Sequence, residues 1–277
     1  MMKDARSLDG KVALITGASR GIGTAIAERF TADGAAVALS ARTRAEGDHP
    51  LPGSVESAVA GITGRGGTAI GVIADLADPA DRARLITEVT SELGRIDVLV
   101  NNAAITYFEP VEQFSQKHYD TMFEVQVRAP FELVQAVVGG MREAGEGWIL
   151  NISSGAARHP QGPPYGRGMN GGTVYGMCKA ALERFTTGLA AELHPDGIAV
   201  NVLSPSGLVA TPGVIHHGLT RNVPDEMLEP IEYMAEAAHA LCTGDPAERT
   251  GKVTYAKRLL EELDIPLPPT APVETGR

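Results

Sequence analysis

Two short segments of the sequence carry groups that can do chemistry together. Tyr175 and Lys179 lie four residues apart, which places a phenol and an ammonium on one face of a helix. An unperturbed tyrosine has a pKa of about 10, and a neighbouring cation lowers this value because it favours the phenolate. Far upstream, residues 16–23 (TGASRGIG) form a glycine-rich turn that can bind a dinucleotide pyrophosphate. Together the two segments indicate hydride transfer with a tyrosine as acid and base.

The context of the glycine turn makes it informative. The turn follows a short apolar run, Val12 to Ile15, and precedes a helical pattern in which Ile22, Ile26 and Phe30 recur. Such a turn exposes backbone N–H groups and a helix N-terminus, both of which attract phosphate. The alternative is a tight strand–helix turn without a ligand, and it explains none of the other motifs.

Apolar strand-like runs alternate with helical patterns along the chain. Strands are predicted at Val12–Ile15, Ala36–Ala41, Thr68–Ala74, Ile96–Val100, Trp148–Ile152, Ile198–Leu203 and Lys252–Tyr255. Asp78 and Pro79 predict a helix start, and a long helical pattern from about Ser115 to Met141 is expected to kink at Pro130. This alternation predicts an α/β fold: a doubly wound, mostly parallel sheet of about seven strands, with helices on both faces and a ligand crevice at the strands' C-terminal ends.

Length and composition fit one enzyme domain spanning residues 1–277, with a core at about 8–256 and a C-terminal helix and Pro-rich tail at 257–277. The net charge of −10 argues against nucleic acid and anionic membranes as partners. The two cysteines give no disulfide framework, and no apolar run approaches the length of a membrane span. We therefore expect a cytoplasmic, water-soluble protein.

Five segments resemble the short-chain dehydrogenase/reductase family, over about residues 8–256. They are 16–23 (TGASRGIG), 101–104 (NNAA), 152–154 (ISS), Tyr175-x-x-x-Lys179 and 201–205 (NVLSP), in the family's order. The resemblance implies a Rossmann-type subunit, usually dimeric or tetrameric. Such a subunit reduces a small-molecule carbonyl or oxidises an alcohol with a nicotinamide cofactor.

The resemblance also implies roles for individual residues. Ser154 is expected to position the substrate oxygen, since the family's serine is usually the second of such a pair, and Tyr175 to transfer the proton. Lys179 is expected to bind the nicotinamide ribose and to lower the tyrosine pKa. Cofactor contacts are expected from Gly17, Ser19, Arg20, Gly21, Ile22, Gly23, Arg42, Asp75, Leu76, Asn102, Ala103, Tyr175, Lys179, Pro205, Val209 and Thr211. Tyr165 is a poor substitute for Tyr175 because no lysine follows four residues later.

Three departures from the family pattern stand out. Gln126 occupies the place of a family asparagine thought to hold a helix kink and a water of the proton relay, so it is included among the catalytic candidates. The segment between Ser154 and Tyr175 is longer than usual and Gly/Pro-rich, which predicts a rim loop that contributes to specificity. The sequence after the last strand lacks the family's common Gly-Gly, which leaves the choice between dimer and tetramer open.

Charge at the end of the second predicted strand bears on the cofactor. NAD-binding relatives carry an acid there that binds both ribose hydroxyls, whereas this strand ends at Ala41-Arg42. Arg42, with Arg20 in the glycine turn, would neutralise the 2′-phosphate of NADP, so NADP(H) is expected rather than NAD(H). The alternative is that Arg42 and Arg44 are solvated loop charges. His216 and His217 have no carboxylate or thiol at ligand spacing, so no metal site is expected.

The leading hypothesis is an NADP(H)-dependent oxidoreductase acting on a ketone or a secondary alcohol, with Tyr175 as acid and base. Reduction of a 3-oxoacyl thioester is the alternative within the same chemistry. A non-catalytic dinucleotide-binding protein is a third possibility, against which the intact Ser154, Tyr175 and Lys179 argue. The sequence does not identify the substrate, its stereochemistry or the physiological direction.

Overall fold

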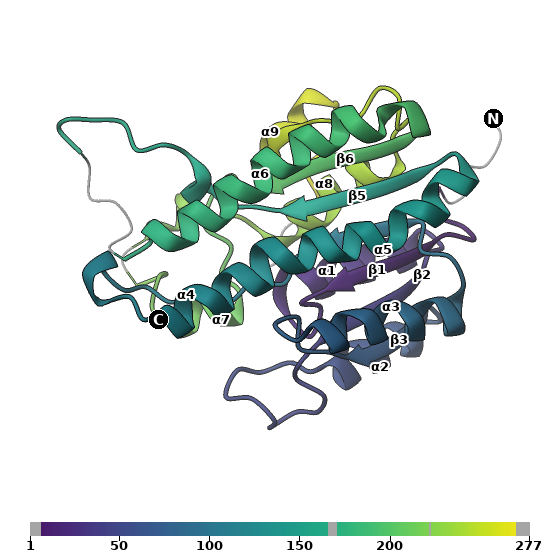
Figure 1. The fold of residues 1–277 in the computed structure, drawn as a ribbon, viewed down its shortest axis with the longest axis horizontal. Helices are drawn as coiled ribbons and strands as arrows, with labels where there is room; N and C mark the ends of the chain where they lie inside the picture. The colour runs from purple at the N-terminus through teal and green to yellow at the C-terminus, as the bar shows by residue number, and fades with distance from the viewer. Residues whose placement is uncertain (1–6, 166–170, 222, 270–277) are drawn as a thin grey trace.

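Seven parallel strands form one sheet in the part of the chain described by the computed structural model, residues 7–165, 171–221 and 223–269. Their order across the sheet is β3-β2-β1-β4-β5-β6-β7 (Figure 1). The strands are β1 Val12–Thr16, β2 Ala36–Ala41, β3 Thr68–Ile73, β4 Val98–Asn101, β5 Gly147–Ile152, β6 Ile198–Ser204 and β7 Val253–Tyr255. Each predicted strand is present with nearly the predicted ends, so the expected fold class is confirmed.

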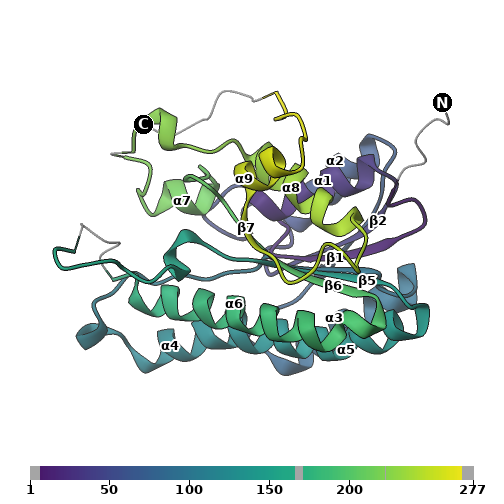
Figure 2. The same cartoon turned by 90° about the horizontal axis from the view of Figure 1, so that it is seen from above.

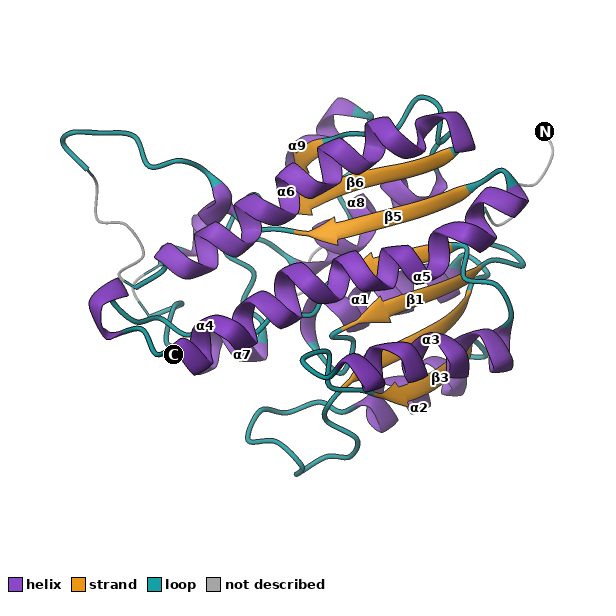
Figure 3. Cartoon of the chain, viewed as in Figure 1, coloured by secondary structure: helices purple, strands orange, loops and turns teal. Residues whose placement is uncertain are grey.

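Helices cover both faces of the sheet. They are α1 Gly21–Ala32, α2 Val55–Gly64, α3 Pro79–Leu93, α4 Gln116–Phe123, α5 Ala129–Ala144, α6 Thr173–Leu193, α7 Pro212–His216, α8 Ile231–Thr243 and α9 Ala256–Glu262. Figure 2 shows α1, α2, α8 and α9 on one face and α3, α5 and α6 on the other. Figure 3 shows the strands pointing the same way, with α4 and α7 beyond their C-terminal ends. Among the described residues, no helix combines the length and the apolar character needed to cross a bilayer.

Side-chain alternation along β1 explains how the sheet holds two helical layers. Ala13 and Ile15 belong to one buried cluster, which includes residues of α1 and α8. Val12 and Leu14 belong to the other, which includes residues of α3, α5 and α6. All five residues of β1 are buried, as expected for a strand covered on both faces.

The predicted helix start at residues 78 and 79 is confirmed. Asp78 caps α3 by accepting a hydrogen bond from the N–H of Ala80 at 2.8 Å, and Pro79 occupies the first turn. The expected continuous helix with a kink at Pro130 has a different form. A five-residue π-helix, Glu124–Arg128, separates α4 from α5, and Pro130 lies in the first turn of α5. The backbone is helical on both sides of this join, and the Ala129 N–H donates to the carbonyl oxygen of Glu124, so the π-helix lies directly before the proline that lacks an N–H.

A set of hydrogen bonds joins β1 to β4 where both strands end. The Thr16 side chain is 1% exposed. Its hydroxyl oxygen accepts hydrogen bonds from the backbone N–H groups of Asn102 and Ala103, each at 3.1 Å. In return, the Asn102 side-chain amide donates to the carbonyl oxygens of Thr16 and Gly17, at 2.9 and 3.0 Å. This set, called here the Thr16–Asn102 clasp, fixes the glycine turn against the end of β4.

Removal of the Thr16 hydroxyl should weaken the fold. In Thr16→Val, an isosteric change, two backbone N–H groups lose their acceptor, and an unsatisfied buried donor costs about 1 to 3 kcal/mol. Thr16→Ser keeps the hydroxyl and serves as the matched control. Urea unfolding monitored by circular dichroism should show the valine variant clearly less stable than the serine variant, and equal stabilities would contradict the role given to the clasp.

Candidate active site

The candidate site lies at the C-terminal edge of the sheet between β1 and β4. After β1 the chain builds β2 and β3 on one side of that strand. It then returns to form β4 and the later strands on the other side of β1. In doubly wound sheets such a switch point forms a crevice that binds ligands. The elements that meet this edge carry the predicted site residues. These residues lie in the glycine turn, at the end of β4 and at the start of α6.

Gly17 allows the glycine turn to approach the end of β4. Its φ of +65° lies in the left-handed region, and a Cβ atom there would lie 2.7 Å from the Cα atom of Ala103. This glycine is therefore required by packing within the protein itself. Ser19 is buried, and Ile22 packs against the core beneath the turn. Thr211, the N-cap of α7, lies against Gly21 from the far side of the crevice.

The N-terminus of α1 is the part of the turn suited to an anion. Its N-cap residue, Arg20, makes no side-chain capping hydrogen bond, and no acidic residue occupies the first turn. By contrast, α2, α3 and α4 begin with serine or aspartate caps. The first N–H groups of a helix have no intrahelical partner and attract phosphate.

Tyr175 and Ser154 meet at the start of α6. Tyr175 is partly buried; burial raises the pKa of its phenol above the usual 10, and a hydrogen bond with Ser154 acts in the opposite direction. The phenol is therefore protonated near neutral pH in this structure, opposite to the net lowering expected from the sequence. The Ser153 hydroxyl instead donates to the Glu183 carboxylate at 2.8 Å. Of the two serines, Ser154 is the one that contacts Tyr175.

A close approach between α6 and the segment after β5 makes this contact possible. A Cβ atom at Gly176 would lie 2.7 Å from the carbonyl oxygen of Ala156, two residues after Ser154. The Ser154 hydroxyl also accepts from the Ala156 N–H at 3.2 Å, which holds the side chain at the end of β5. Tyr165 is 68% exposed. Of the predicted rim loop, Pro160 to Gly172, residues 166–170 lie outside the described residues.

Lys179 lies one helical turn beyond Tyr175 and is 3% exposed. Its Nζ donates to the carbonyl oxygen of Ile152 at 2.9 Å and lies 5.7 Å from the centre of the Tyr175 ring. Burial lowers the lysine pKa to about 8, so the ammonium form prevails at neutral pH. The next residue toward Tyr175, Cys178, is fully buried in the core, as expected.

Gln126 lies within the π-helix, and its side chain is 1% exposed. Its Nε2 donates to the carbonyl oxygen of Ile105 at 2.9 Å, whereas its Oε1 is buried without a partner among the described residues. The side chain therefore holds the loop that follows β4. This contact was not expected from the sequence, which placed Gln126 among the catalytic candidates.

An aromatic group that the sequence analysis missed lies beside Tyr175. The ring of Phe108 packs edge-on against Tyr175, at 6.4 Å between centres, and against His217 of the segment after α7, at 5.5 Å. The loop 102–110 that carries Phe108 is the one held by Gln126. The sequence did offer a signal for this aromatic group. Ile105, Tyr107 and Phe108 lie close together after a buried strand, where aromatic side chains are unusual in a loop.

The residues expected near the adenosine occupy the other end of the crevice. Arg42 follows β2, is exposed, and forms no ion pair with a described carboxylate. The guanidinium of Arg20 donates to the carbonyl oxygens of Pro52 and Gly53 and to the Thr43 hydroxyl. Asp75 follows β3, and its carboxylate accepts from the N–H of Ala77 at 3.0 Å. Leu76 is buried, and its carbonyl oxygen accepts from Arg82.

The segment after β6 carries Pro205 and the buried Val209. A second group missed by the sequence analysis anchors it: Glu229, 4% exposed, accepts from the N–H groups of Ser206 and Gly207 at 2.8 and 3.2 Å. Burial raises the pKa of this carboxyl. Glu229 lies shortly before the start of α8, and nothing in the sequence pattern indicated that it anchors the segment after β6. No group of described residues has the composition of a metal site.

Comparison with known proteins identifies the family. Residues 11–220 match the model of the short chain dehydrogenase family. The chain belongs to that family. It is 36% identical to the short-chain reductase protein NovJ of Streptomyces niveus, over 89% of this chain and 87% of that protein.

Two solved structures have the same fold. A putative dehydrogenase from Xanthomonas campestris matches with a TM-score of 0.81 and 32% identity, over 93% of this chain and 91% of its own. A metagenomic short-chain oxidoreductase in complex with NADP matches with a TM-score of 0.71 and 30% identity, over 90% and 97%. The protein is thus an oxidoreductase of a family that binds nicotinamide cofactors.

Removal of the Gln126 side chain should affect stability more than turnover. Gln126→Ala leaves the Ile105 carbonyl without its donor, and a lost buried partner costs about 1 to 3 kcal/mol. If the amide serves only as a support, turnover should fall by less than about tenfold, which corresponds to roughly 1.4 kcal/mol of barrier. Thermal unfolding and steady-state kinetics are measured on the same samples, and a much larger loss of turnover would show that the amide takes part in proton transfer.

Proposed function

We propose that the protein is an NADP(H)-dependent reductase of ketones, or dehydrogenase of secondary alcohols, in which Tyr175 is the acid and base. The observation that carries the proposal is the partly buried Tyr175 phenol beside the Ser154 hydroxyl, with the Lys179 ammonium 5.7 Å from the centre of its ring. The three groups lie on elements that meet the crevice where the glycine turn and the uncapped N-terminus of α1 are found.

The crevice suits a dinucleotide. The N-terminus of α1 has no side-chain cap and offers N–H groups to a pyrophosphate. Asn102 and Ala103 lie against Gly17 of the glycine turn, and Thr211 lies against Gly21. Pro205 and Val209 belong to the segment between β6 and α7, which ends at Thr211. When bound, the nicotinamide supplies a hydride to the substrate carbonyl carbon, or accepts one from the alcohol.

The protein's own groups account for the proton. In reduction, the Tyr175 hydroxyl donates its proton to the substrate oxygen as the carbonyl becomes an alcohol, and in oxidation the phenolate takes that proton back. A raised pKa keeps Tyr175 in its donor form near neutral pH. The Ser154 hydroxyl donates a hydrogen bond to the same oxygen and holds it near the phenol. The Lys179 ammonium stabilises the phenolate that remains after the transfer.

Charge at the adenosine end supports NADP(H) over NAD(H). No carboxylate stands at the end of β2, where NAD-binding proteins hold the ribose hydroxyls, and Arg42 stands there, exposed and without an ion-pair partner among the described residues. The related metagenomic oxidoreductase was solved with NADP. The proposal is tested by assaying the protein with NADPH against a panel of ketones and 3-oxoacyl thioesters. If no compound of either class is turned over, a non-catalytic role is favoured.

Removal of one oxygen tests the proton donor. Tyr175→Phe keeps the ring against Phe108 and deletes the hydroxyl. General acid catalysis contributes roughly 10²- to 10⁴-fold, so turnover should fall at least a hundredfold while NADPH still binds. Tyr165→Phe, at an exposed tyrosine, is the control and should retain activity. Near-normal turnover in Tyr175→Phe would remove this residue from the mechanism.

A charge reversal tests the cofactor assignment. Arg42→Asp removes a phosphate partner and adds a carboxylate that repels the 2′-phosphate but accepts hydrogen bonds from a ribose hydroxyl. A charge-assisted hydrogen bond contributes about 1.5 to 3 kcal/mol, so kcat/KM for NADPH should fall roughly ten- to a hundredfold relative to NADH. Arg44→Asp, at a second exposed arginine two residues on, is the control. A wild type that already prefers NADH, or an unchanged ratio in Arg42→Asp, would show that Arg42 is a solvated loop charge.

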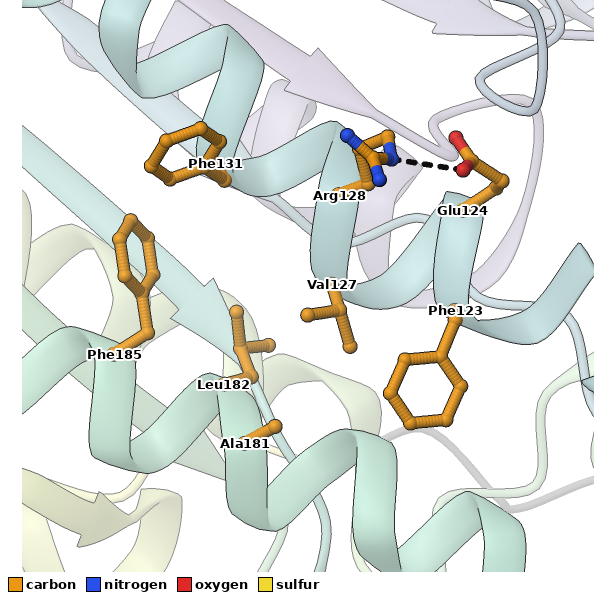
Figure 4. Close-up of a pocket in the computed structure, with 8 residues that line it drawn as sticks. All are labelled: Phe123, Glu124, Val127, Arg128, Phe131, Ala181, Leu182 and Phe185. Atoms are coloured by element: carbon orange, nitrogen blue, oxygen red, sulfur yellow. Dashed lines mark hydrogen bonds and ion pairs between the residues drawn. The ribbon is translucent and has the colours of Figure 1, made fainter. Parts of the chain in front are cut away.

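We also propose that the protein is a homo-oligomer that associates through an apolar groove between α5 and α6. Figure 4 shows the side chains that line it, which come from the end of α4, the π-helix, α5 and α6: Phe123, Glu124, Val127, Arg128, Phe131, Ala181, Leu182 and Phe185. Phe131 is 45% exposed, and its ring lies 6.1 Å from that of Phe185. Exposed aromatic pairs in an apolar groove are typical of protein interfaces, and family members are usually dimers or tetramers.

A charged residue in the groove should separate the subunits. Phe131→Glu places a carboxylate in the proposed interface, where its desolvation is unfavourable, so the molar mass by light scattering after size exclusion should fall toward that of the monomer. Val111→Glu, at a 61% exposed apolar residue outside the groove, should keep the wild-type mass. If circular dichroism shows that Phe131→Glu is folded and light scattering shows that it keeps the wild-type mass, the groove is not the interface.

A further inference from the structure

One face of α6 carries three ionisable residues at successive turns, Tyr175, Lys179 and Glu183. All three have a partner in one short segment, residues 152–154 at the end of β5. The carbonyl oxygen of the first residue of this segment accepts from Lys179 at 2.9 Å, and the hydroxyl of the second donates to Glu183 at 2.8 Å. The hydroxyl of the third lies beside the Tyr175 phenol. The function proposed above uses Tyr175 and Lys179 but gives no role to Glu183.

The Ser153 hydroxyl fixes the place of the Glu183 carboxylate. Ser153 is 4% exposed, and its N–H donates to the carbonyl oxygen of Leu203 at 2.9 Å, so its backbone is held in the sheet. Glu183 is partly buried, and its carboxylate has no other hydrogen bond or ion pair among the described residues. Because Ile152 binds the Lys179 ammonium, the carboxylate and the ammonium are bound by adjacent residues of one rigid strand end.

Glu183 supplies negative charge where Lys179 is buried. Lys179 is 3% exposed, and burial lowers its pKa to about 8. The two groups that act in the opposite direction are Cys178 and Glu183. Burial raises the pKa of the Cys178 thiol to about 11, so this group is uncharged near neutral pH. The carboxylate of Glu183 is therefore the anion that favours the ammonium form of Lys179.

The other elements that pack against this part of α6 bring no further charge to Lys179 within the described part of the chain. β5 and β6 contain no ionisable residue. Glu124 and Arg128 of the π-helix bind each other at 2.8 Å and line the groove of Figure 4. The ionisable residues of the loop 102–110 and of α4, none of which is among the charges that act on Lys179, are Tyr107, Glu109, Lys117, His118, Tyr119 and Asp120.

We propose that Glu183 is a positioning residue of the reaction, which keeps Lys179 in its ammonium form while Ser153 holds the carboxylate in place. This inference rests on the proposed function, in which the ammonium stabilises the phenolate that remains after proton transfer. Glu183 does not contact the reacting atoms and acts only through Lys179. The buried ammonium depends on such a partner because burial by itself favours the neutral amine.

The sign of the pH dependence follows from the charge of Lys179. The ammonium form is complete well below pH 8 and is lost as the pH rises through the lysine pKa of about 8, so ketone reduction should fall over the same range. Loss of the Glu183 charge makes the ammonium less favourable and moves this fall to lower pH. A neighbouring opposite charge changes a pKa by about one unit or more, so at pH 8 the charged fraction should drop from about one half to about one tenth.

Glu183→Gln tests the charge alone, because the amide keeps an oxygen that accepts from Ser153. With saturating NADPH, kcat/KM for a ketone should stay close to wild type at pH 6 and fall about fivefold at pH 8. Ser153→Ala keeps the charge but releases its orientation, so it should show a smaller loss at pH 8 and none at pH 6. Glu192→Gln, at an exposed glutamate in the last turn of α6, is the matched control and should follow the wild-type profile.

A double-mutant cycle on the protein without cofactor gives a readout that is independent of turnover. A buried ammonium costs stability below its folded pKa of about 8, and the cost is relieved as the pH rises through that value toward 10.5, the ordinary pKa of lysine. At pH 7, Glu183→Gln should therefore lower the urea midpoint of wild type. It should not lower the midpoint of Lys179→Met, which has no ammonium. Equal decreases in the two backgrounds would show that Glu183 has only a structural role.

The outcomes separate this inference from the proposed function. If Tyr175→Phe is inactive but Glu183→Gln follows wild type at pH 8, the role of Glu183 is refuted and the proposed function stands. A similar loss at pH 6 and pH 8 equally refutes the role, since the residue would then only support the fold. If Glu183→Gln shows the expected pattern but Ser153→Ala matches wild type, the part given to Ser153 is wrong. If Tyr175→Phe keeps its turnover, the proposed function is wrong and the inference falls with it.

Discussion

The Thr16–Asn102 clasp is the interaction on which the geometry of the crevice depends. Strands β1 and β4 are neighbours in the sheet but are far apart in sequence, and the chain departs from them in opposite directions. The backbone ladder between the two strands runs only as far as the pair Ile15 and Val100. Beyond that pair, one hydroxyl and one amide hold the two chain segments together, because each satisfies backbone groups at the end of the other strand. The glycine turn, and with it the N-terminus of α1, is placed by that exchange.

The fold was predictable because its signals are local and repeated. A strand such as β1, buried on both faces, must be apolar throughout, and a helix such as α3 announces its start by Asp78 and Pro79. The join between α4 and α5 was not predictable in the same way. The residues of the π-helix keep helical periodicity in sequence, and the extra residue in the turn becomes visible only through the backbone hydrogen bond from Ala129 to Glu124. Pro130 marked the region, but the departure from α-helical geometry is the π-helix that precedes it.

The candidate site was predictable where its residues follow a fixed spacing. Tyr175 and Lys179 are adjacent on one helix, and the choice of Ser154 over Ser153 agrees with the contact of Ser153 to Glu183. The partners of Arg20, the anchoring of residues 206 and 207 by Glu229, and the packing of Phe108 on Tyr175 join segments distant in sequence. A single sequence carries no periodicity that reports such contacts. The raised pKa of Tyr175 was not predictable for the same reason, because burial is a property of the assembled structure and outweighs the opposing effect of Ser154.

The π-helix of residues 124–128 has a consequence for how the sequence can change. Its inner side presents Gln126 to the loop after β4, and its outer side presents Val127 and Arg128 to the groove on the surface. Successive residues of a helix point about 100° apart, so loss of one residue here would turn α5 by that amount relative to α4. Either the amide would leave Ile105 or the groove would lose its lining. A change of length at this join would therefore disturb one of the two contacts, whereas a substitution can leave the direction of both sides unchanged.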